Sequence, residues 1–108
     1  MNPELKRAAE LAAEYLDSLD QQKVSEEPDP QAIRNRLHKE LTNEGLPPLQ
    51  VIEELAEDAR DGLLNTANGR FFGWVIGGGV PVSIAADWLT SAWDQNAAAY
   101  ACSPAAAV

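Results

Sequence analysis

The charged residues of this chain of 108 residues stop abruptly after Arg70. Fifteen of the seventeen acidic residues and all eight lysines and arginines lie before Phe71, and only Asp87 and Asp94 follow it. Of the last 38 residues, 24 are hydrophobic. Such a segment needs cover from another element, another subunit or more chain, because soluble proteins rarely leave a large apolar surface in water. The apolar part is therefore expected to form a protein core or an interface.

The acidic balance of the chain limits its partners. The net charge is −9 and the isoelectric point is near 4.4, so nucleic acids and anionic membrane surfaces would repel it. Pro81, Asp87 and Asp94 interrupt the apolar part well short of the ~20 apolar residues that a bilayer-spanning helix needs. The single cysteine, Cys102, allows no intrachain disulfide, and the charged N-terminus has no apolar signal-peptide stretch. We therefore predict a cytoplasmic protein that binds neither nucleic acid nor membrane.

Three short amphipathic helices are predicted in the charged part. The first two begin with a proline at the first position, where the missing N–H has no helical partner to lose. The first runs over about residues 3–20, the second starts at residue 30 and stops before Gly45, and Pro47 and Pro48 separate it from the third. The apolar face of the third helix is expected to carry Ile52, Leu55 and Ala59. Its acidic residues are expected to face water, namely Glu53, Glu54, Glu57 and Asp58.

The apolar part has a different pattern. Residues 71–79 combine β-forming residues with three consecutive glycines, which predicts an extended segment that runs into a glycine loop. Pro81 then opens one long apolar helix that runs to about Tyr100. A Ser-Pro pair caps a further helix over residues 105–108, and because the chain stops within its first turn we expect a truncated protein. The predicted fold class is therefore mostly α: short amphipathic helices, a glycine loop and one long apolar helix.

Several spaced elements of the apolar part resemble one enzyme family. Residues 70–78 read RFFGWVIGG, and they are followed by Pro81, by AADWL at residues 85–89, by WDQN at residues 93–96 and by Ser103-Pro104. This combination resembles the N-terminal part of the group II pyridoxal-phosphate-dependent amino-acid decarboxylases, which include aromatic-amino-acid, glutamate and diaminobutyrate decarboxylases. Before Arg70 the resemblance is general only, an acidic leader of short helices.

The resemblance implies a parent enzyme with an α/β fold, that of the aspartate-aminotransferase-like pyridoxal-phosphate-dependent transferases. Residues 1–80 would form an N-terminal helical dimerisation segment with its glycine loop, and residues 81–108 the first helices of a truncated large cofactor domain. The parent would be a homodimer joined through its N-terminal helices, and it would remove the α-carboxylate of an amino acid as CO2. Its pyridoxal phosphate would accept the electrons that the departing carboxylate leaves behind.

The resemblance places the family's catalytic and cofactor-binding residues outside this chain. The Schiff-base lysine would lie beyond Val108, and Lys6, Lys23, Lys39 and His38 stand in no matching context. His38 has no second His, Cys or carboxylate at ligand spacing, so no metal site is predicted. The 108-residue chain alone is therefore expected to be inactive, with no catalytic and no cofactor-binding residue.

The resemblance assigns to this chain a part of the substrate-pocket wall. The residues that it implies are Trp74, Val75, Ile76, Gly77, Asn96 and Ala98. The first four would contact the substrate side chain, and the last two would reach the neighbouring subunit's site. Aromatic-amino-acid members carry bulky apolar residues at the last two positions, so the small and polar residues here argue against an aromatic substrate.

Simpler interpretations of the same residues stay open. The glycine run at residues 77–79 lacks the spacing of a dinucleotide site, so a hinge or a closely packed loop is favoured over ligand contact. Trp88 and Trp93 on an apolar helix more often belong to a core or an interface than to a cofactor platform. The chain could instead be a stand-alone acidic helical interaction module without catalysis, which docks on a partner through Trp74, Trp88 and Trp93.

Overall fold

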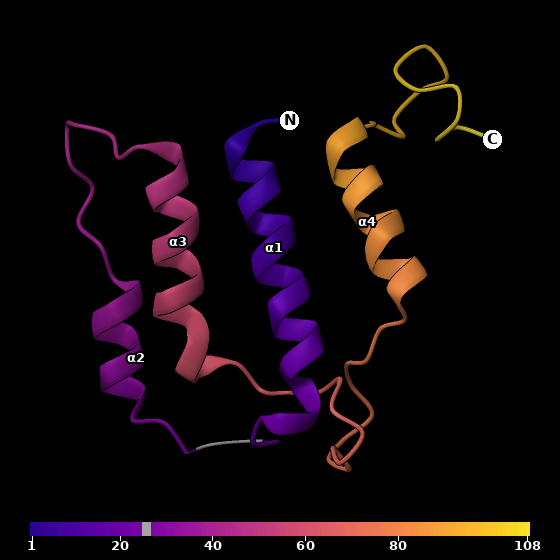
Figure 1. Cartoon of the computed structure of the whole chain (residues 1–108). Helices are drawn as coiled ribbons and strands as arrows, with labels where there is room; N and C mark the ends of the chain where they lie inside the picture. Colours follow the sequence, from indigo (N-terminus) through magenta and orange to yellow (C-terminus); the bar gives the residue numbers. More distant parts are fainter. Residues whose placement is uncertain (25–26) are drawn as a thin grey trace. The chain divides into compact units, whose positions relative to one another are not determined.

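The computed structural model describes residues 1–24 and 27–108, which divide into two compact units, residues 1–76 and 77–108 (Figure 1). The described residues form helices and turns and contain no β-strand, which confirms the prediction of a mostly α chain. None of the helices in these residues has the length and apolar character that a bilayer crossing requires.

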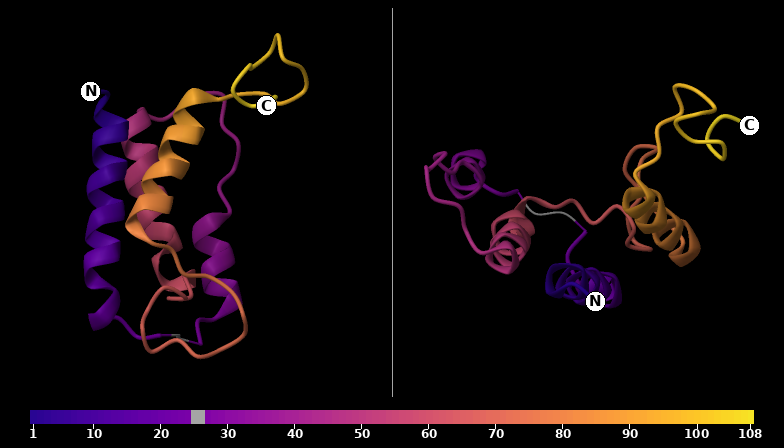
Figure 2. Two further views of the ribbon diagram at one scale, coloured as in Figure 1. Left: turned by 90° about the vertical axis from the view of Figure 1, so that its right-hand side faces the viewer. Right: turned by 90° about the horizontal axis from the view of Figure 1, so that it is seen from above.

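The first unit consists of three helices. α1 spans Pro3–Ser18, α2 spans Pro30–Leu37 and α3 spans Pro48–Ala59. α3 lies between the other two helices and contacts both (Figure 2). α1 and α3 run in the same direction, and α2 runs the opposite way (Figure 1). Two short 3₁₀ helices, η1 at Leu19–Gln21 and η2 at Arg60–Gly62, extend α1 and α3.

α1 begins where it was predicted and ends close to the predicted end. Pro3 is at the first helical position, and the Glu4 carboxylate lies in the first turn, where negative charge is favourable. The α-helix ends at Ser18 and the chain continues as η1 through the predicted end at Asp20. The Ser18 hydroxyl donates to the Tyr15 carbonyl at 2.8 Å, a local bond that competes with regular helical pairing.

α2 is shorter than its sequence pattern predicts. Its start is as expected, because the Asp29 carboxylate accepts a hydrogen bond from the Gln31 backbone N–H at 3.0 Å. The predicted helix up to Gly45 is wrong, since the helix ends at Leu37. Leu41, which follows Ile33 and Leu37 at helical spacing, is fully exposed. A helix that continued past Leu37 would bury nothing, and short helices depend on such burial for their stability.

Ion pairs join α3 to the elements on both of its sides. Arg7 of α1 binds Glu53, with Nε 2.5 Å from Oε1. Lys39, which follows α2, lies 3.2 Å from Glu54 and 2.8 Å from Asp58. The prediction that the acidic residues of α3 face water is therefore wrong for Glu54 and Asp58, whose side chains are 35% and 20% exposed. Partly exposed pairs contribute little stability each, so they mainly set how the helices align.

No apolar side chain among the described residues is fully buried. The buried residues are polar: Asn65, Asn68 and Ser103. On the predicted apolar face of α3, Ile52 is half-buried, whereas Leu55 is 59% exposed. The described apolar side chains therefore all keep some contact with solvent.

The segment between the helices of the two units forms bends and turns. The extended conformation predicted for residues 71–76 is wrong, because these β-forming residues have no partner strand in the described part of the chain. Trp74 adopts a left-handed backbone with φ of 41°, and Gly77 and Gly78 follow with φ of 72° and 84°. The left-handed region is open to glycine but costs other residues about 1–2 kcal/mol. The predicted glycine loop is thus present, with a strained tryptophan before it.

The second unit contains one helix, α4, which spans Pro81–Trp93. The prediction that this helix reaches Tyr100 is wrong, since Asp94 turns left-handed with φ of 48° and ends it. Asn96 Oδ1 then accepts a hydrogen bond from the Ala98 backbone N–H at 2.8 Å. Aspartate and asparagine offer the backbone such local alternatives to a helix, which explains the early end.

The C-terminal residues form one turn in place of the helix predicted over residues 105–108. Ser103 is almost completely buried, and its hydroxyl accepts a hydrogen bond from the Ala106 backbone N–H at 3.3 Å. The Ala107 N–H donates to the Pro104 carbonyl at 3.4 Å. The predicted cap therefore exists, but it supports a single turn.

Candidate functional site

The most enclosed part of the first unit lies where the chain after η2 meets the end of α1. Asn65 and Asn68 are only 7% and 4% exposed there. Together with Arg70 they bind backbone carbonyls within residues 19–24. We call Asn65, Asn68 and Arg70 the polar latch.

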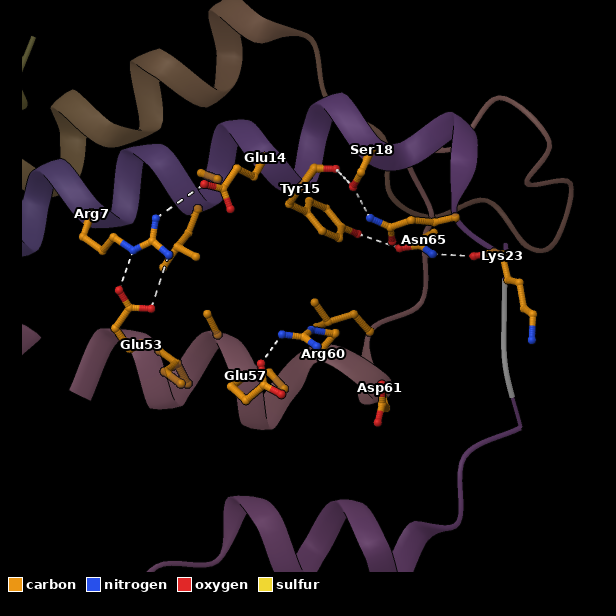
Figure 3. Close-up of a pocket in the computed structure, with 17 residues that line it drawn as sticks. Arg7, Glu14, Tyr15, Ser18, Lys23, Glu53, Glu57, Arg60, Asp61 and Asn65 are labelled. Carbon is orange, nitrogen blue, oxygen red and sulfur yellow. Dashed lines mark hydrogen bonds and ion pairs between the residues drawn. The ribbon is translucent and has the colours of Figure 1, made fainter. Parts of the chain in front are cut away.

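Asn65 joins α1 to the segment that follows it. Its Oδ1 accepts the Tyr15 hydroxyl at 2.9 Å, and its Nδ2 donates to the Lys23 carbonyl (Figure 3). The Asn65 backbone N–H donates to the Val24 carbonyl at 3.1 Å. Both polar ends of this buried side chain therefore have partners, as a buried amide requires.

Asn68 and Arg70 bind the carbonyls at the end of α1. Asn68 Nδ2 donates to the Leu19 carbonyl and, at 3.4 Å, to the Gln22 carbonyl. Asn68 Oδ1 accepts the Arg70 backbone N–H at 2.8 Å. The Arg70 guanidinium donates to the Asp20 carbonyl at 3.2 Å and to the Gln22 carbonyl at 2.7 Å. Because a helix leaves its last carbonyls unpaired, the latch acts as the cap of α1 and η1.

A groove of about 1050 Å³ lies between α1 and α3 within the first unit (Figure 3). The ion pair of Arg7 and Glu53 stands at one end, and the hydrogen bond of Tyr15 and Asn65 stands at the other. Apolar side chains from both helices line the space between, among them Leu11, Leu55 and Ala59. The groove therefore offers apolar contact between two polar ends.

Five of the charged groups at the groove, Arg7, Glu14, Glu53, Glu57 and Arg60, are paired with one another. The hydrogen bond to Glu53 raises the pKa of Arg7 above its ordinary value, so the guanidinium keeps its charge. Arg7 also lies 3.4 Å from Glu14, and Arg60 binds Glu57. These contacts pair carboxylates with cations and place no nucleophile beside a general base. The groove thus combines paired charges with apolar side chains.

All of the predicted substrate-pocket residues are exposed: Trp74, Val75, Ile76, Gly77, Asn96 and Ala98. Trp74 and Ile76 are 80% and 52% exposed, and Val75 is fully exposed. These three residues end the first unit. Gly77, Asn96 and Ala98 lie in the second unit. Asn96 and Ala98 are brought together by the hydrogen bond between them.

The sequence pattern did not reveal the latch or the groove. Asn65 and Asn68 are common turn residues, and nothing in their spacing shows that their side chains reach α1. The one available signal is chemical: two asparagines and Arg70 fall within six residues of one another, and they supply many hydrogen-bond donors. Tyr15, in the apolar stripe of α1, is the matching signal on the other side, because a covered tyrosine hydroxyl usually has a partner.

The described residues do not fit covalently bound pyridoxal phosphate. Lys6, Lys23 and Lys39 all have exposed side chains, whereas a Schiff-base lysine needs an enclosed site that favours the neutral amine. The hydrogen bonds to Asp58 and Glu54 raise the pKa of Lys39, which keeps its amine protonated. Within the described part of the chain there is also no group of three or more His, Cys, Asp and Glu residues placed to hold a metal ion.

Comparison of the chain with protein families, with curated proteins and with solved structures gives no match. The resemblance of residues 70–104 to the decarboxylases thus stays a prediction from the sequence. The function has to be argued from that pattern and from the surface that the chain presents.

Proposed function

We propose that this chain forms the N-terminal part of a group II pyridoxal-phosphate-dependent amino-acid decarboxylase, in which it supplies dimer contacts and part of the substrate-pocket wall. The spaced elements within residues 70–104 support the assignment. In the proposed parent, residues 1–80 are the dimerisation segment and residues 81–108 begin the large domain of an α/β transferase fold. The cytoplasm is its proposed location, which the single cysteine supports.

The spaced pattern within residues 70–104 is the observation that carries this proposal. In both units the described apolar side chains also keep contact with solvent, since none of them is fully buried. Soluble proteins rarely leave a large apolar surface in water. We infer that a second subunit and further domain structure cover this surface.

Apolar side chains supply the surface that a partner would cover. In the first unit Leu5, Val51 and Leu55 are 63%, 45% and 59% exposed. In the second unit Trp88 and Trp93 of α4 are 48% and 62% exposed. Two copies of a chain with a net charge of −9 repel each other at long range, so their contact has to come from apolar burial.

The loop at Trp74 is the proposed contribution to the substrate pocket. Trp74 combines an exposed ring with a left-handed backbone, and strained residues of this kind cluster at functional sites. Asn96 and Ala98, the other proposed wall positions, are polar and small. We therefore propose a substrate with an aliphatic or polar side chain, not an aromatic one.

Residues of the parent enzyme outside this chain would hold the pyridoxal phosphate, because the lysines here do not fit it. We assign no catalytic step to any residue of this chain. Its role is to cover and shape the site, and the chain alone is expected to release no CO2 from any amino acid.

The test uses the full-length product of the gene that encodes these residues. We expect the purified protein to show the visible absorption of bound pyridoxal phosphate and to release CO2 from a non-aromatic amino acid. Trp74→Ala should raise KM for that substrate, whereas Phe72→Ala, which removes an exposed aromatic ring from the same loop, should leave KM unchanged. A full-length protein that binds no pyridoxal phosphate would refute the proposal.

A second candidate function is a stand-alone acidic helical interaction module. The polar latch favours it, because Asn65, Asn68 and Arg70 close the first unit with contacts from within that unit. This candidate predicts that the 108-residue chain unfolds cooperatively as a monomer at micromolar concentration. The decarboxylase proposal predicts association of the isolated chain at that concentration, because its apolar surface is uncovered.

A further inference from the structure

Asn68 of the polar latch is part of an Asn-Gly dipeptide, and such dipeptides can react spontaneously. Asn68 is the only asparagine in the chain that a glycine follows. In an Asn-Gly pair the glycine backbone nitrogen can attack the carbonyl carbon of the asparagine side chain, since no Cβ on the glycine hinders the approach. A bond forms between the Gly69 nitrogen and Asn68 Cγ, the bond to Nδ2 breaks, and ammonia leaves with the proton of the Gly69 nitrogen. Water then opens the resulting ring to aspartate or isoaspartate, and no oxidant or reductant is needed.

The closed latch opposes this reaction. Asn68 is 4% exposed, its Nδ2 donates to the Leu19 and Gln22 carbonyls, and its Oδ1 accepts the Arg70 N–H. Both ends of the reacting amide are therefore held, and little water can reach it. The glycine itself is not enclosed, because a Cβ placed on Gly69 would meet nothing within 4 Å. Protection thus comes from the fixed Asn68 side chain and not from crowding at Gly69.

We propose that Asn68 is a site of spontaneous modification that the closed latch protects and that, once modified, keeps the latch open. The product replaces the Nδ2 donor by a carboxylate oxygen. That oxygen would face the Leu19 and Gln22 carbonyls, so two attractive contacts become repulsive. Asn68 reacts in molecules whose latch is open, and the loss of ammonia is not reversed. The fraction of modified Asn68 therefore increases with the time that the latch has spent open. This inference does not depend on the proposed function.

The experiment follows conversion of Asn68 by mass spectrometry of proteolytic peptides while the 108-residue chain is incubated at physiological temperature and pH. A synthetic peptide of residues 63–74 supplies the rate without the latch. We expect Asn68 to convert at least about tenfold more slowly in the chain, because only the open fraction reacts. Asn65, which shares the latch but precedes Thr66, is the internal control and should stay unmodified.

Two variants separate the latch from general unfolding. Gly69→Ala should slow conversion strongly, because the added methyl group hinders the attack, and it should raise the melting temperature slightly, because the site is open and Gly69 has no left-handed backbone. Arg70→Lys should speed conversion of Asn68, because the latch then opens more often. Lysine lacks the planar guanidinium group that donates hydrogen bonds to the Asp20 and Gln22 carbonyls. Equal rates for Asn68 in the chain and in the peptide would overturn the proposal. So would a wild-type chain whose melting temperature falls no further during incubation than that of the Gly69→Ala chain.

Discussion

Replacement of Asn65 by alanine tests whether polar contacts hold the first unit together. The variant loses the bond from the Tyr15 hydroxyl at 2.9 Å and the bond from Nδ2 to the Lys23 carbonyl, and it keeps the backbone bond to Val24. Each such bond contributes about 1 kcal/mol, and at a site that is 7% exposed water replaces it poorly. We therefore expect the free energy of unfolding to fall by about 2 kcal/mol.

Urea unfolding followed by far-UV circular dichroism measures this loss. With an m-value of about 2 kcal/mol/M, a loss of about 2 kcal/mol lowers the urea midpoint by about 1 M. All variants are compared at one protein concentration, so that any association contributes equally to each. An unchanged m-value would show that the variant alters stability and not the compactness of the unfolded chain.

Tyr15→Phe is the matched control, because it removes only the hydroxyl that Asn65 accepts. We expect it to cost about 1 kcal/mol. The double variant should cost no more than Asn65→Ala alone, since both changes remove the same bond. The reasoning is wrong if Asn65→Ala costs less than about 0.5 kcal/mol, or if the two single losses add in the double variant.

Three further predictions concern charge, backbone and surface. A hydrogen bond from Gln50 is the main cause that lowers the pKa of Glu54, so its contribution to stability is present above the ordinary value of 4.5 and is lost as the pH falls through the lower folded value. Glu54→Gln should therefore reduce the loss of helicity in an acid titration followed by circular dichroism. In thermal melts, Gly45→Ala should add about 0.5 kcal/mol because the site is open, whereas Gly78→Ala should remove about 1 kcal/mol because its φ is 84°. Trp88→Gln should lower the self-association that sedimentation velocity measures, and an unchanged sedimentation profile would contradict a role for α4 in it.

The starts of the helices could be predicted because local chemistry decides them. A proline stands at the first position of α1, α2 and α4, as predicted, and the Asp29 carboxylate caps α2. α3 begins at Pro48, one of the two prolines that were expected to separate it from α2. The ends could not be predicted in the same way. α2 stops at Leu37 because nothing covers its continuation. α4 stops at Trp93 because Asp94 has a left-handed backbone and the Asn96 side chain accepts the Ala98 N–H. Helix length here depends on contacts that the apolar pattern does not contain.

The buried polar residues of the candidate site could not be predicted from the sequence for a related reason. The apolar periodicity marks Leu55 as core, yet this residue is exposed, and the buried positions are Asn65 and Asn68, which look like ordinary turn residues. A hydrophobic pattern shows which face of a helix needs cover, but it does not show whether the same chain supplies that cover. Here the contacts within each unit leave these faces open, so the pattern indicates a need for cover that neither unit meets by its own contacts.

The two kinds of contact have different weights in stability. A buried neutral hydrogen bond of the latch contributes about 1 kcal/mol, whereas burial of one exposed leucine or tryptophan contributes about 1.5–3 kcal/mol. With twenty large apolar side chains exposed, even partial cover outweighs the whole latch. The latch therefore decides how the end of α1 and the Trp74 loop are joined, and the covering surface decides how stable the joined state is. It follows that a partner which covers α1 and α3 should also slow the opening of the latch, and hence the modification of Asn68, without touching that residue.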